Sequence, residues 1–151
     1  SLVRTAWIDR GIRNFPIAAS TPHLFNHESG FDDDTSAMTA FIETAPMDIG
    51  DGDKFVSLKR VIPDLTFTGS VTGSSPNATF TVKARDFPGS DFDQTGTGTT
   101  RTATSPVEQF TEKLDYRIRG RSFAIRLDSS ALGCKFKMGT PRVDIREDGR
   151  R

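Results

Sequence analysis

The sequence predicts an all-β protein, an antiparallel β-sandwich of jelly-roll-like type. Apolar and polar residues alternate with a period of two in five short segments, and helical periodicity is nearly absent. The 151 residues include 18 Thr and 12 Phe but one Trp and one Tyr, and both Thr and Phe favour strands. Strands with one apolar and one polar face are typical of antiparallel sheets that are exposed to solvent on one side.

The second half of the chain carries the clearest alternation. Its apolar positions fall in the segments 80–84, 114–118, 123–127, 134–138 and 143–145. Gly120 separates two of these segments, and Gly133 and Gly139 bracket a third, so tight turns or bulges are expected at all three glycines. We expect a hairpin loop over residues 68–77 and a long polar loop over 94–106. Residues 105–108 also fit a helix start with Pro at its first position, but strand entry is favoured there.

The first half of the chain is less regular. We expect strands at 4–9 and 24–27 with a loop over 11–22 between them. Residues 37–43 are apolar on nearly both faces, which predicts a strand buried between layers, with a helix capped by Asp34 as the competing interpretation. The apolar run 55–67 contains Pro63, which favours an edge strand or a bulge.

These patterns divide the chain near residue 50. Residues 1–50 are expected to end a preceding β domain or to connect to one, and residues 51–151 are expected to form the sandwich. The chain starts without Met, which favours a processed protein or a fragment of a longer one. Its single cysteine, Cys134, excludes an internal disulfide framework and is expected to be a buried structural thiol.

Charge is balanced in total but not along the chain. Lys and Arg number 20 and Asp and Glu number 20, which argues against a strongly basic nucleic-acid-binding chain. Residues 1–53 hold 3 basic and 9 acidic side chains (net −6), whereas residues 113–151 hold 11 basic and 5 acidic (net +6). This gradient predicts ion pairs either within the chain or between neighbouring subunits. A third interpretation places the arginines of the basic end on a nucleic-acid backbone.

The candidate interface residues come from the two oppositely charged ends. They are Arg117, Arg119, Arg121 and Arg126 on the basic side and Asp32, Asp33 and Asp34 on the acidic side. The arginines are expected to project from polar sides of adjacent strands onto Asp32–Asp34 or Asp51–Asp53, in the same subunit or in the next.

Two acidic or histidine-bearing segments raise the question of a metal. His23 and His27 are four residues apart, but Pro22 and the β-rich context favour ordinary turn residues over a zinc site. Carboxylates also cluster in numbers that would suit calcium, although their order does not fit an EF-hand loop and solvated turns are the main interpretation. The calcium candidates are Asp32, Asp34, Asp48, Asp51 and Asp53.

The sequence shows no catalytic or cofactor-binding motif. It has no nucleophile elbow, phosphate-binding loop or dinucleotide fingerprint. No stretch approaches the roughly 18 apolar residues of a membrane span. We therefore expect a non-enzymatic protein without a cofactor and without a membrane.

Several segments resemble virion structural proteins of short-tailed bacteriophages. The first group corresponds to the late part of those proteins and comprises residues 27–34, 37–43, 48–55 and 60–65. The second resembles their C-terminal end and comprises residues 117–127, 132–133 and 139–151. Lys135 and Lys137 depart from the pattern, because a less charged segment is expected there. Whether this face meets a neighbour or solvent therefore stays open.

The resemblance implies a tail component of the nozzle, packaged-DNA-stabilisation or head–tail connector type. Such proteins are generally longer, carry a β-propeller before the C-terminal region, and form rings around the DNA channel. The first 50 residues would then complete or pack on a propeller. The implied partners are other copies of the chain, neighbouring tail or portal-adapter proteins and, non-specifically, packaged DNA. The implied location is the virion tail after assembly in the bacterial cytoplasm. A host-receptor or carbohydrate-binding tail module is the alternative.

Overall fold

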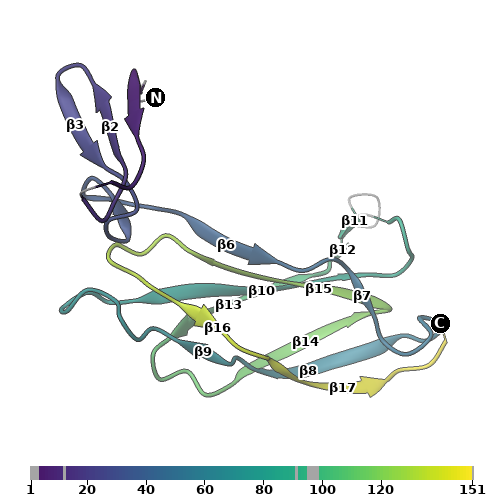
Figure 1. The fold of residues 1–151 in the computed structure, drawn as a ribbon. Coiled ribbons are helices and arrows are strands. Elements are labelled where there is room, and N and C mark those ends of the chain that lie inside the picture. The colour runs from purple at the N-terminus through teal and green to yellow at the C-terminus, as the bar shows by residue number, and fades with distance from the viewer. Residues whose placement is uncertain (1–3, 12, 91, 95–98, 151) are drawn as a thin grey trace. The chain divides into compact units, whose positions relative to one another are not determined.

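The computed structural model describes residues 4–11, 13–90, 92–94 and 99–150 (Figure 1). Contacts divide the chain into two compact units, Ser1–Phe31 and Asp32–Arg151. Every regular element in the described residues is a β-strand, and all strand pairs are antiparallel. The prediction of an all-β antiparallel protein is therefore confirmed. Neither a closed barrel nor a propeller forms in this part of the chain.

The first unit is a three-stranded sheet in the order β1-β2-β3. Its strands are β1 (Ala6–Ile8), β2 (Ile17–Ser20) and β3 (His23–Asn26). The strands expected at 4–9 and 24–27 are thus present as β1 and β3, and the expected loop contains β2. Ala18 on the central strand is fully buried, whereas Trp7, Ile8 and Leu24 are exposed.

The second unit contains two larger sheets that share one core (Figure 1). The larger has the order β13-β10-β15-β6, with β7 also paired to β15. Its strands are β6 (Ala40–Glu43), β7 (Met47–Asp48), β10 (Asn77–Arg85), β13 (Thr102–Glu108) and β15 (Ser122–Ser129). The smaller has the order β14-β8-β17 and consists of β8 (Val56–Ile62), β14 (Leu114–Gly120) and β17 (Arg142–Glu147).

Three short strand pairs complete the second unit. They are β4 (Asp32–Asp33) with β5 (Ser36–Ala37), β9 (Leu65–Thr66) with β16 (Lys137–Met138), and β11 (Asp93–Gln94) with β12 (Thr99–Thr100).

The core lies between the two larger sheets. Its buried members alternate along the strands, as expected for sheets with one dry face. They include Leu58 and Val61 from β8, Phe80 and Val82 from β10, Tyr116 and Ile118 from β14, and Phe123 and Leu127 from β15. The Tyr116 hydroxyl donates to the Phe80 carbonyl at 3.2 Å. Burial raises the pKa of Tyr116 above its ordinary value.

Four of the five alternating segments form the expected strands, β10, β14, β15 and β17. Gly120 ends β14 immediately before the chain crosses to β15 in the other sheet, and a Cβ there would lie 2.9 Å from the Ala84 Cβ. The segment 134–138 forms a strand only at Lys137–Met138. Its backbone is bound elsewhere, because Lys135 N–H donates to Ser70 Oγ and Ser70 Oγ donates to the Lys135 carbonyl.

The expectation that residues 37–43 are buried between layers is wrong. They form a strand and not a helix, but β6 is an edge strand whose four residues are all exposed. Ile42 lies opposite buried Leu127 and so belongs to the inner face, yet it is 49% exposed. The apolar side chains of β6 therefore lie along an uncovered edge of the larger sheet.

The run 55–67 also differs from its predicted edge position. Its strand β8 is the centre of the smaller sheet, and Pro63 follows the strand end, where no ladder hydrogen bond is lost. The bulge that Pro63 suggested occurs instead at Lys59, which has no partner in β17. Residues 68–77 connect β9 to β10, which pair with other strands, so they are not a hairpin loop.

Two further expectations concern residues 94–106 and the boundary near residue 50. Residues 102–108 form β13, so strand entry is confirmed and the helical turn is absent. The expectation of one long polar loop over 94–106 is therefore wrong for residues 94, 99–100 and 102–106, which belong to strands. Residues 95–98 of the expected polar loop lie outside the described residues. The main division by contacts falls after Phe31 and not near residue 50, because β6 and β7 pair with β15.

Candidate functional site

The outer face of the smaller sheet carries a concentration of basic side chains. We call it the cationic face. It comprises Lys59, Arg60, Arg117, Arg119, Arg142 and Arg146 on β8, β14 and β17. These positions alternate with core residues such as Leu58, Val61 and Ile118, so strand geometry directs them away from the core.

Strand register arranges this face in rows. Asp144, Arg60 and Asp115 are neighbours across β17, β8 and β14, and the Arg60 Nε donates to the Asp115 Oδ1 at 3.1 Å. The register shifts in β14 between Asp115 and Ile118, and Lys59 of β8 has no partner in either neighbouring strand, so Lys59 and Arg117 both fall in the irregular stretch between the paired rows. Cross-strand neighbours of opposite charge thus stabilise the row of Asp144, Arg60 and Asp115. The irregular stretch next to it contains two basic side chains and no acidic one.

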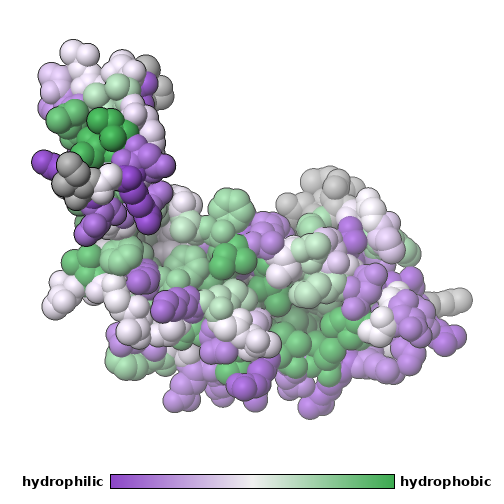
Figure 2. Space-filling view, viewed as in Figure 1, coloured by the Kyte–Doolittle hydropathy of each residue, from purple (hydrophilic) through white to green (hydrophobic). Residues whose placement is uncertain are grey.

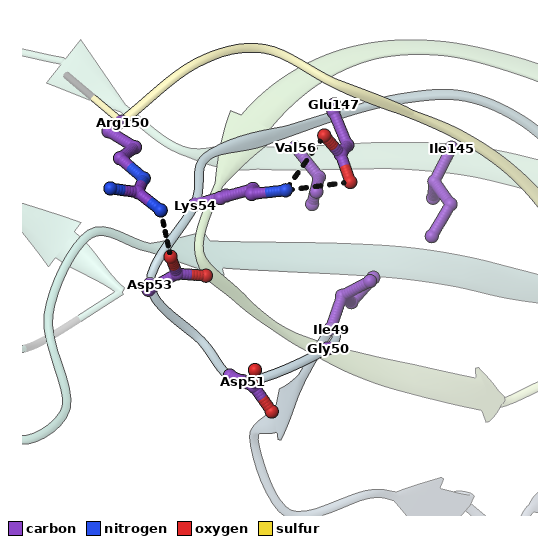
Figure 3. A pocket seen from close by; sticks show the side chains of 9 residues that line it. All are labelled: Ile49, Gly50, Asp51, Asp53, Lys54, Val56, Ile145, Glu147 and Arg150. Carbon is purple, nitrogen blue, oxygen red and sulfur yellow. Dashed lines mark hydrogen bonds and ion pairs between the residues drawn. The ribbon is translucent and has the colours of Figure 1, made fainter.

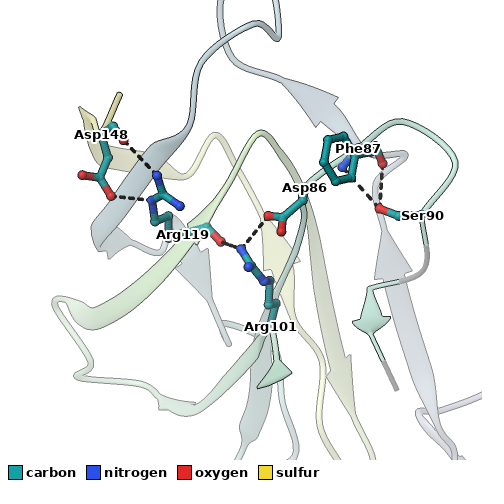
Figure 4. Close-up of polar contacts among 6 residues, drawn as sticks. All are labelled: Asp86, Phe87, Ser90, Arg101, Arg119 and Asp148. Atoms are coloured by element: carbon teal, nitrogen blue, oxygen red, sulfur yellow. Dashed lines mark hydrogen bonds and ion pairs between the residues drawn. The ribbon is translucent and has the colours of Figure 1, made fainter. Parts of the chain in front are cut away.

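Arg119 is tied to the C-terminal segment. Its Nε donates to Asp148 Oδ2 at 2.6 Å and its Nη2 donates to the Asp148 carbonyl at 3.0 Å (Figure 4). Its guanidinium also lies 4.1 Å from the Phe55 ring centre. The cations Lys59, Arg117, Arg142 and Arg146 are exposed, and none of them forms an ion pair within the described part of the chain.

The structure does not bring the four predicted arginines into one site. Arg121 lies over the Phe55 and Phe87 rings, at 4.7 and 5.4 Å from their centres, and donates to the Arg150 carbonyl. Arg126 lies on the larger sheet, 4.2 Å from the Phe41 ring centre. Only Arg117 and Arg119 belong to the cationic face.

Arg126 takes part in an ion-pair group around Glu43. Glu43 accepts from Lys83 Nζ at 2.6 Å and from Arg126 Nη1 at 2.9 Å, while Arg126 Nε donates to Asp128 at 3.2 Å. The hydrogen bonds from Lys83 and then Arg126 lower the pKa of Glu43 below its ordinary value, because they favour the charged carboxylate.

This shift predicts a loss of stability in acid. A lowered pKa in the folded state means that the unfolded chain binds the proton more readily, so Glu43 stabilises the fold above its unfolded pKa, and this contribution disappears as pH falls through the folded pKa. Glu43→Gln should flatten the decline of the melting temperature below about pH 5. Thermal unfolding of both proteins between pH 7 and about pH 3 measures the difference, and parallel curves would contradict it.

The acidic residues 32–34 form the β4–β5 hairpin. Asp32 is part of the fold, since its Oδ1 accepts from Gly133 N–H at 2.7 Å. Asp34 and Thr35 at the turn have positive φ angles of 44° and 72°. The exposed Asp33 and Asp34 have no ion-pair partner among the residues described here. The hairpin therefore presents two uncompensated carboxylates.

The second acidic segment borders a cavity of about 430 Å³ (Figure 3). Ile49, Gly50, Asp51 and Asp53 line one side, and Ile145 and Glu147 line another. Lys54 pairs with Glu147 at 3.0 Å and Arg150 pairs with Asp53 at 3.3 Å, so most charges at the cavity are already compensated.

The described residues contain no group of three or more His, Cys, Asp or Glu side chains placed to hold a metal ion. The calcium candidates lie instead in the β4–β5 hairpin and in the loop that borders the cavity. His23 is on β3 rather than in a turn, and His27 accepts from Arg4 Nε at 3.2 Å and contacts the Trp7 ring. Cys134 is partly buried against the core.

Sequence reasoning missed part of the cationic face and a shielded ion pair. Lys59, Arg142 and Arg146 were detectable as the polar half of alternating strands, but their assembly depends on β8 lying between β14 and β17. Arg101 Nη1 donates to Asp86 Oδ1 at 2.5 Å and to the Arg119 carbonyl at 3.0 Å (Figure 4). No local pattern marks these two residues as partners.

Comparison with known proteins leaves the family open: no protein-family model matches the chain, and no curated protein matches it. Within the described residues, no helix has the length and apolar character needed to cross a membrane.

Proposed function

We propose that this chain is a structural component of a bacteriophage tail or head–tail connector, in which copies contact one another in a ring around the DNA channel. The observation that carries the proposal is the presence of two oppositely charged surfaces whose charges lack partners among the described residues. One holds four exposed cations on a sheet face, and the other holds two exposed carboxylates on the β4–β5 hairpin. The resemblance to virion proteins of short-tailed phages supports the same assignment.

The proposed contact is head-to-tail. The β4–β5 hairpin of one copy docks on the cationic face of the next, with Asp33 and Asp34 facing Lys59 and Arg117. Two different surfaces meet at every contact, and such contacts close into rings when the rotation allows. Complementary charge sets the register of the contact and speeds encounter more than it adds affinity.

The finer architecture belongs to the same proposal. The two larger sheets form a jelly-roll-like β-sandwich, and the three-stranded first unit completes or packs on a preceding domain such as a propeller. Its exposed Trp7, Ile8 and Leu24 support this, because apolar side chains on a small sheet need a covering surface. Adjacent tail or portal-adapter proteins are the further partners, in a virion assembled in the bacterial cytoplasm, with packaged DNA touched non-specifically.

The test is the native mass of the chain in low and high salt. We expect a salt-sensitive oligomer, because exposed ion pairs weaken as salt screens them. Lys59→Glu with Arg117→Glu should abolish it, and adding Asp33→Lys with Asp34→Lys should restore it. Arg13→Glu with Lys137→Glu, two exposed residues outside the cationic face, is the control, because it makes the same change in net charge. A monomer at every salt concentration, or an oligomer unaffected by the reversals, would contradict the proposed contact. Salt-dependent binding of duplex DNA by the cationic face without self-association would assign the face to phosphates instead.

A second candidate function rests on one aromatic residue. Trp7 is 54% exposed and packs against His27 with ring centres 4.9 Å apart, which is a geometry suited to stacking on a sugar. Tyr116, the single tyrosine, is buried in the core. If the chain is a carbohydrate-binding tail module, calorimetric titration with host polysaccharide should show binding that Trp7→Ala removes. Absence of heat with either protein would exclude this candidate.

A further inference from the structure

We propose that strand β17 pairs antiparallel with β17 of a second copy of this chain, about a two-fold axis that passes through Ile145. β17 is the edge of the smaller sheet, with β8 on one side and no strand of the described residues on the other. An edge strand leaves a row of N–H and C=O groups that a further strand can bind.

The backbone phase of β17 places every second residue on the free side. Asp148 N–H donates to the Phe55 carbonyl at 2.8 Å, so the even-numbered residues direct their backbone groups toward β8. The irregularity in this pair lies in β8 at Lys59, so alternation along β17 is uninterrupted. Val143, Ile145 and Glu147 therefore direct their N–H and C=O groups to the open edge.

A two-fold axis through Ile145 uses all three of these residues. Ile145 then faces Ile145 of the second copy as a hydrogen-bonded pair, and Val143 faces Glu147 on each side of it. In an antiparallel ladder the residues between such pairs are opposed at shorter Cα distances, so their side chains lie closer. These intervening positions are occupied by charged side chains on the outer face.

The charges select this register. With the axis at Ile145, Asp144 faces Arg146 of the second copy, which gives two cross-strand pairs of opposite sign by symmetry. Arg142 faces Asp148, just beyond the strand, whose carboxylate also keeps its bond to Arg119. Moving the axis to Asp144 would oppose Asp144 to itself and Arg142 to Arg146. Moving it to Arg146 would oppose Arg146 to itself and Asp144 to Asp148. Like charges directly opposite one another destabilise a strand pair, and opposite charges stabilise it.

The side chains on the inner face of β17 are also compatible with this strand pairing. Val143 lies opposite buried Val61 but is 42% exposed, and Figure 2 shows hydrophobic residues reaching the surface between the two layers on this side. A second copy of β17 would extend the sheet past this rim. Glu147 keeps its counter-ion there, because Lys54 holds both carboxylate oxygens at 3.0 and 3.2 Å.

This edge contact differs from the head-to-tail contact of the proposed function in its symmetry and in the cations that meet a partner. The head-to-tail contact uses Lys59 and Arg117, whereas the edge contact uses Arg142 and Arg146 at the β17 border of the same face. A single strand pair falls at the small end of protein interfaces, below about 1,200 Å² of buried surface. We therefore expect a weak, concentration-dependent dimer of the isolated chain.

Sedimentation of the full chain over a range of concentrations tests the register through a charge swap. D144R and R146D each place like charges opposite one another twice and should weaken dimerisation by at least ~10-fold. The double variant D144R/R146D restores the pairs and should dimerise like the parent. An equimolar mixture of the two single variants should form a mixed dimer, because each supplies what the other lacks. Circular dichroism verifies that each variant is folded.

A backbone variant gives an independent measurement. I145P removes one N–H from the open edge while leaving the bonds to β8 intact, so it should abolish the dimer. I145A loses the same packing against the core but keeps the N–H, so it should dimerise like the parent. A parent chain that stays monomeric at all concentrations would overturn the proposal, as would a dimer that ignores the single reversals. The Lys59→Glu/Arg117→Glu variant distinguishes the two contacts, since it should lose the salt-sensitive ring contact and keep the β17 dimer.

Discussion

Phe80→Ala is expected to lower the free energy of unfolding of the second unit by about 3–5 kcal/mol. Phe80 is fully buried on β10, which lies between β13 and β15, so removing its ring leaves a cavity that two paired neighbours cannot collapse to fill. Urea unfolding of the full chain measures the change.

The matched control is Phe110→Ala. Phe110 is 87% exposed, so the same substitution removes no packed contact, and its cost should stay within about 0.5 kcal/mol. Should Phe80→Ala fail to fold, Phe80→Leu keeps much of the side-chain volume and should destabilise the fold less than Phe80→Ala, but more than Phe110→Ala does. Equal losses for Phe80→Ala and Phe110→Ala would contradict the assigned core.

The core and most strands of the second unit follow from local alternation. Phe80, Tyr116, Ile125 and Leu127 are buried because each lies on the apolar side of a strand whose other side is polar. Such a pattern states which face of a strand is dry, and it needs no knowledge of neighbours. That is why β10, β14, β15 and β17 could be predicted from the sequence.

The neighbours of each strand could not be predicted this way. Residues 37–43 are apolar on both sides, which fits a central strand and also an uncovered edge, and the edge is what β6 occupies. Pro63 indicated an interruption but not that β8 would end before it. The segment 134–138 alternates like a strand, yet Ser70 binds its backbone from a distant part of the chain.

The candidate site shows the same limit. The basic end of the sequence supplies Arg117, Arg119, Arg142 and Arg146 to the cationic face, whereas Lys59 and Arg60 come from the middle of the chain. The individual pairing of arginines depends on tertiary contacts: Arg119 binds Asp148, whereas Arg126 binds Glu43 on a different sheet. Net charge along a chain therefore predicts that a charged surface exists, while strand order decides which residues compose it.

The second large effect concerns the ion pair of Asp86 and Arg101. Asp86 is 9% exposed, and the Arg101 side chain is largely shielded from solvent. Arg101 Nη1 already serves both Asp86 and the Arg119 carbonyl, and its buried Nε has no hydrogen-bond partner within the described part of the chain. Removing the carboxylate would leave a guanidinium without a counter-ion in a place that water reaches poorly.

Asp86→Ala is therefore expected to cost about 3 kcal/mol, because an unpaired shielded charge is penalised more than the pair itself stabilises. Asp115→Ala removes the partner of Arg60 in an exposed pair and should cost less than about 1 kcal/mol. The double variant Asp86→Ala/Arg101→Met should recover much of the loss, since it removes the stranded charge as well. Chemical unfolding of these proteins and of the single variant Arg101→Met gives the differences. If the double variant lost as much stability as Asp86→Ala and Arg101→Met added together, the penalty would come from lost packing and not from the uncompensated charge.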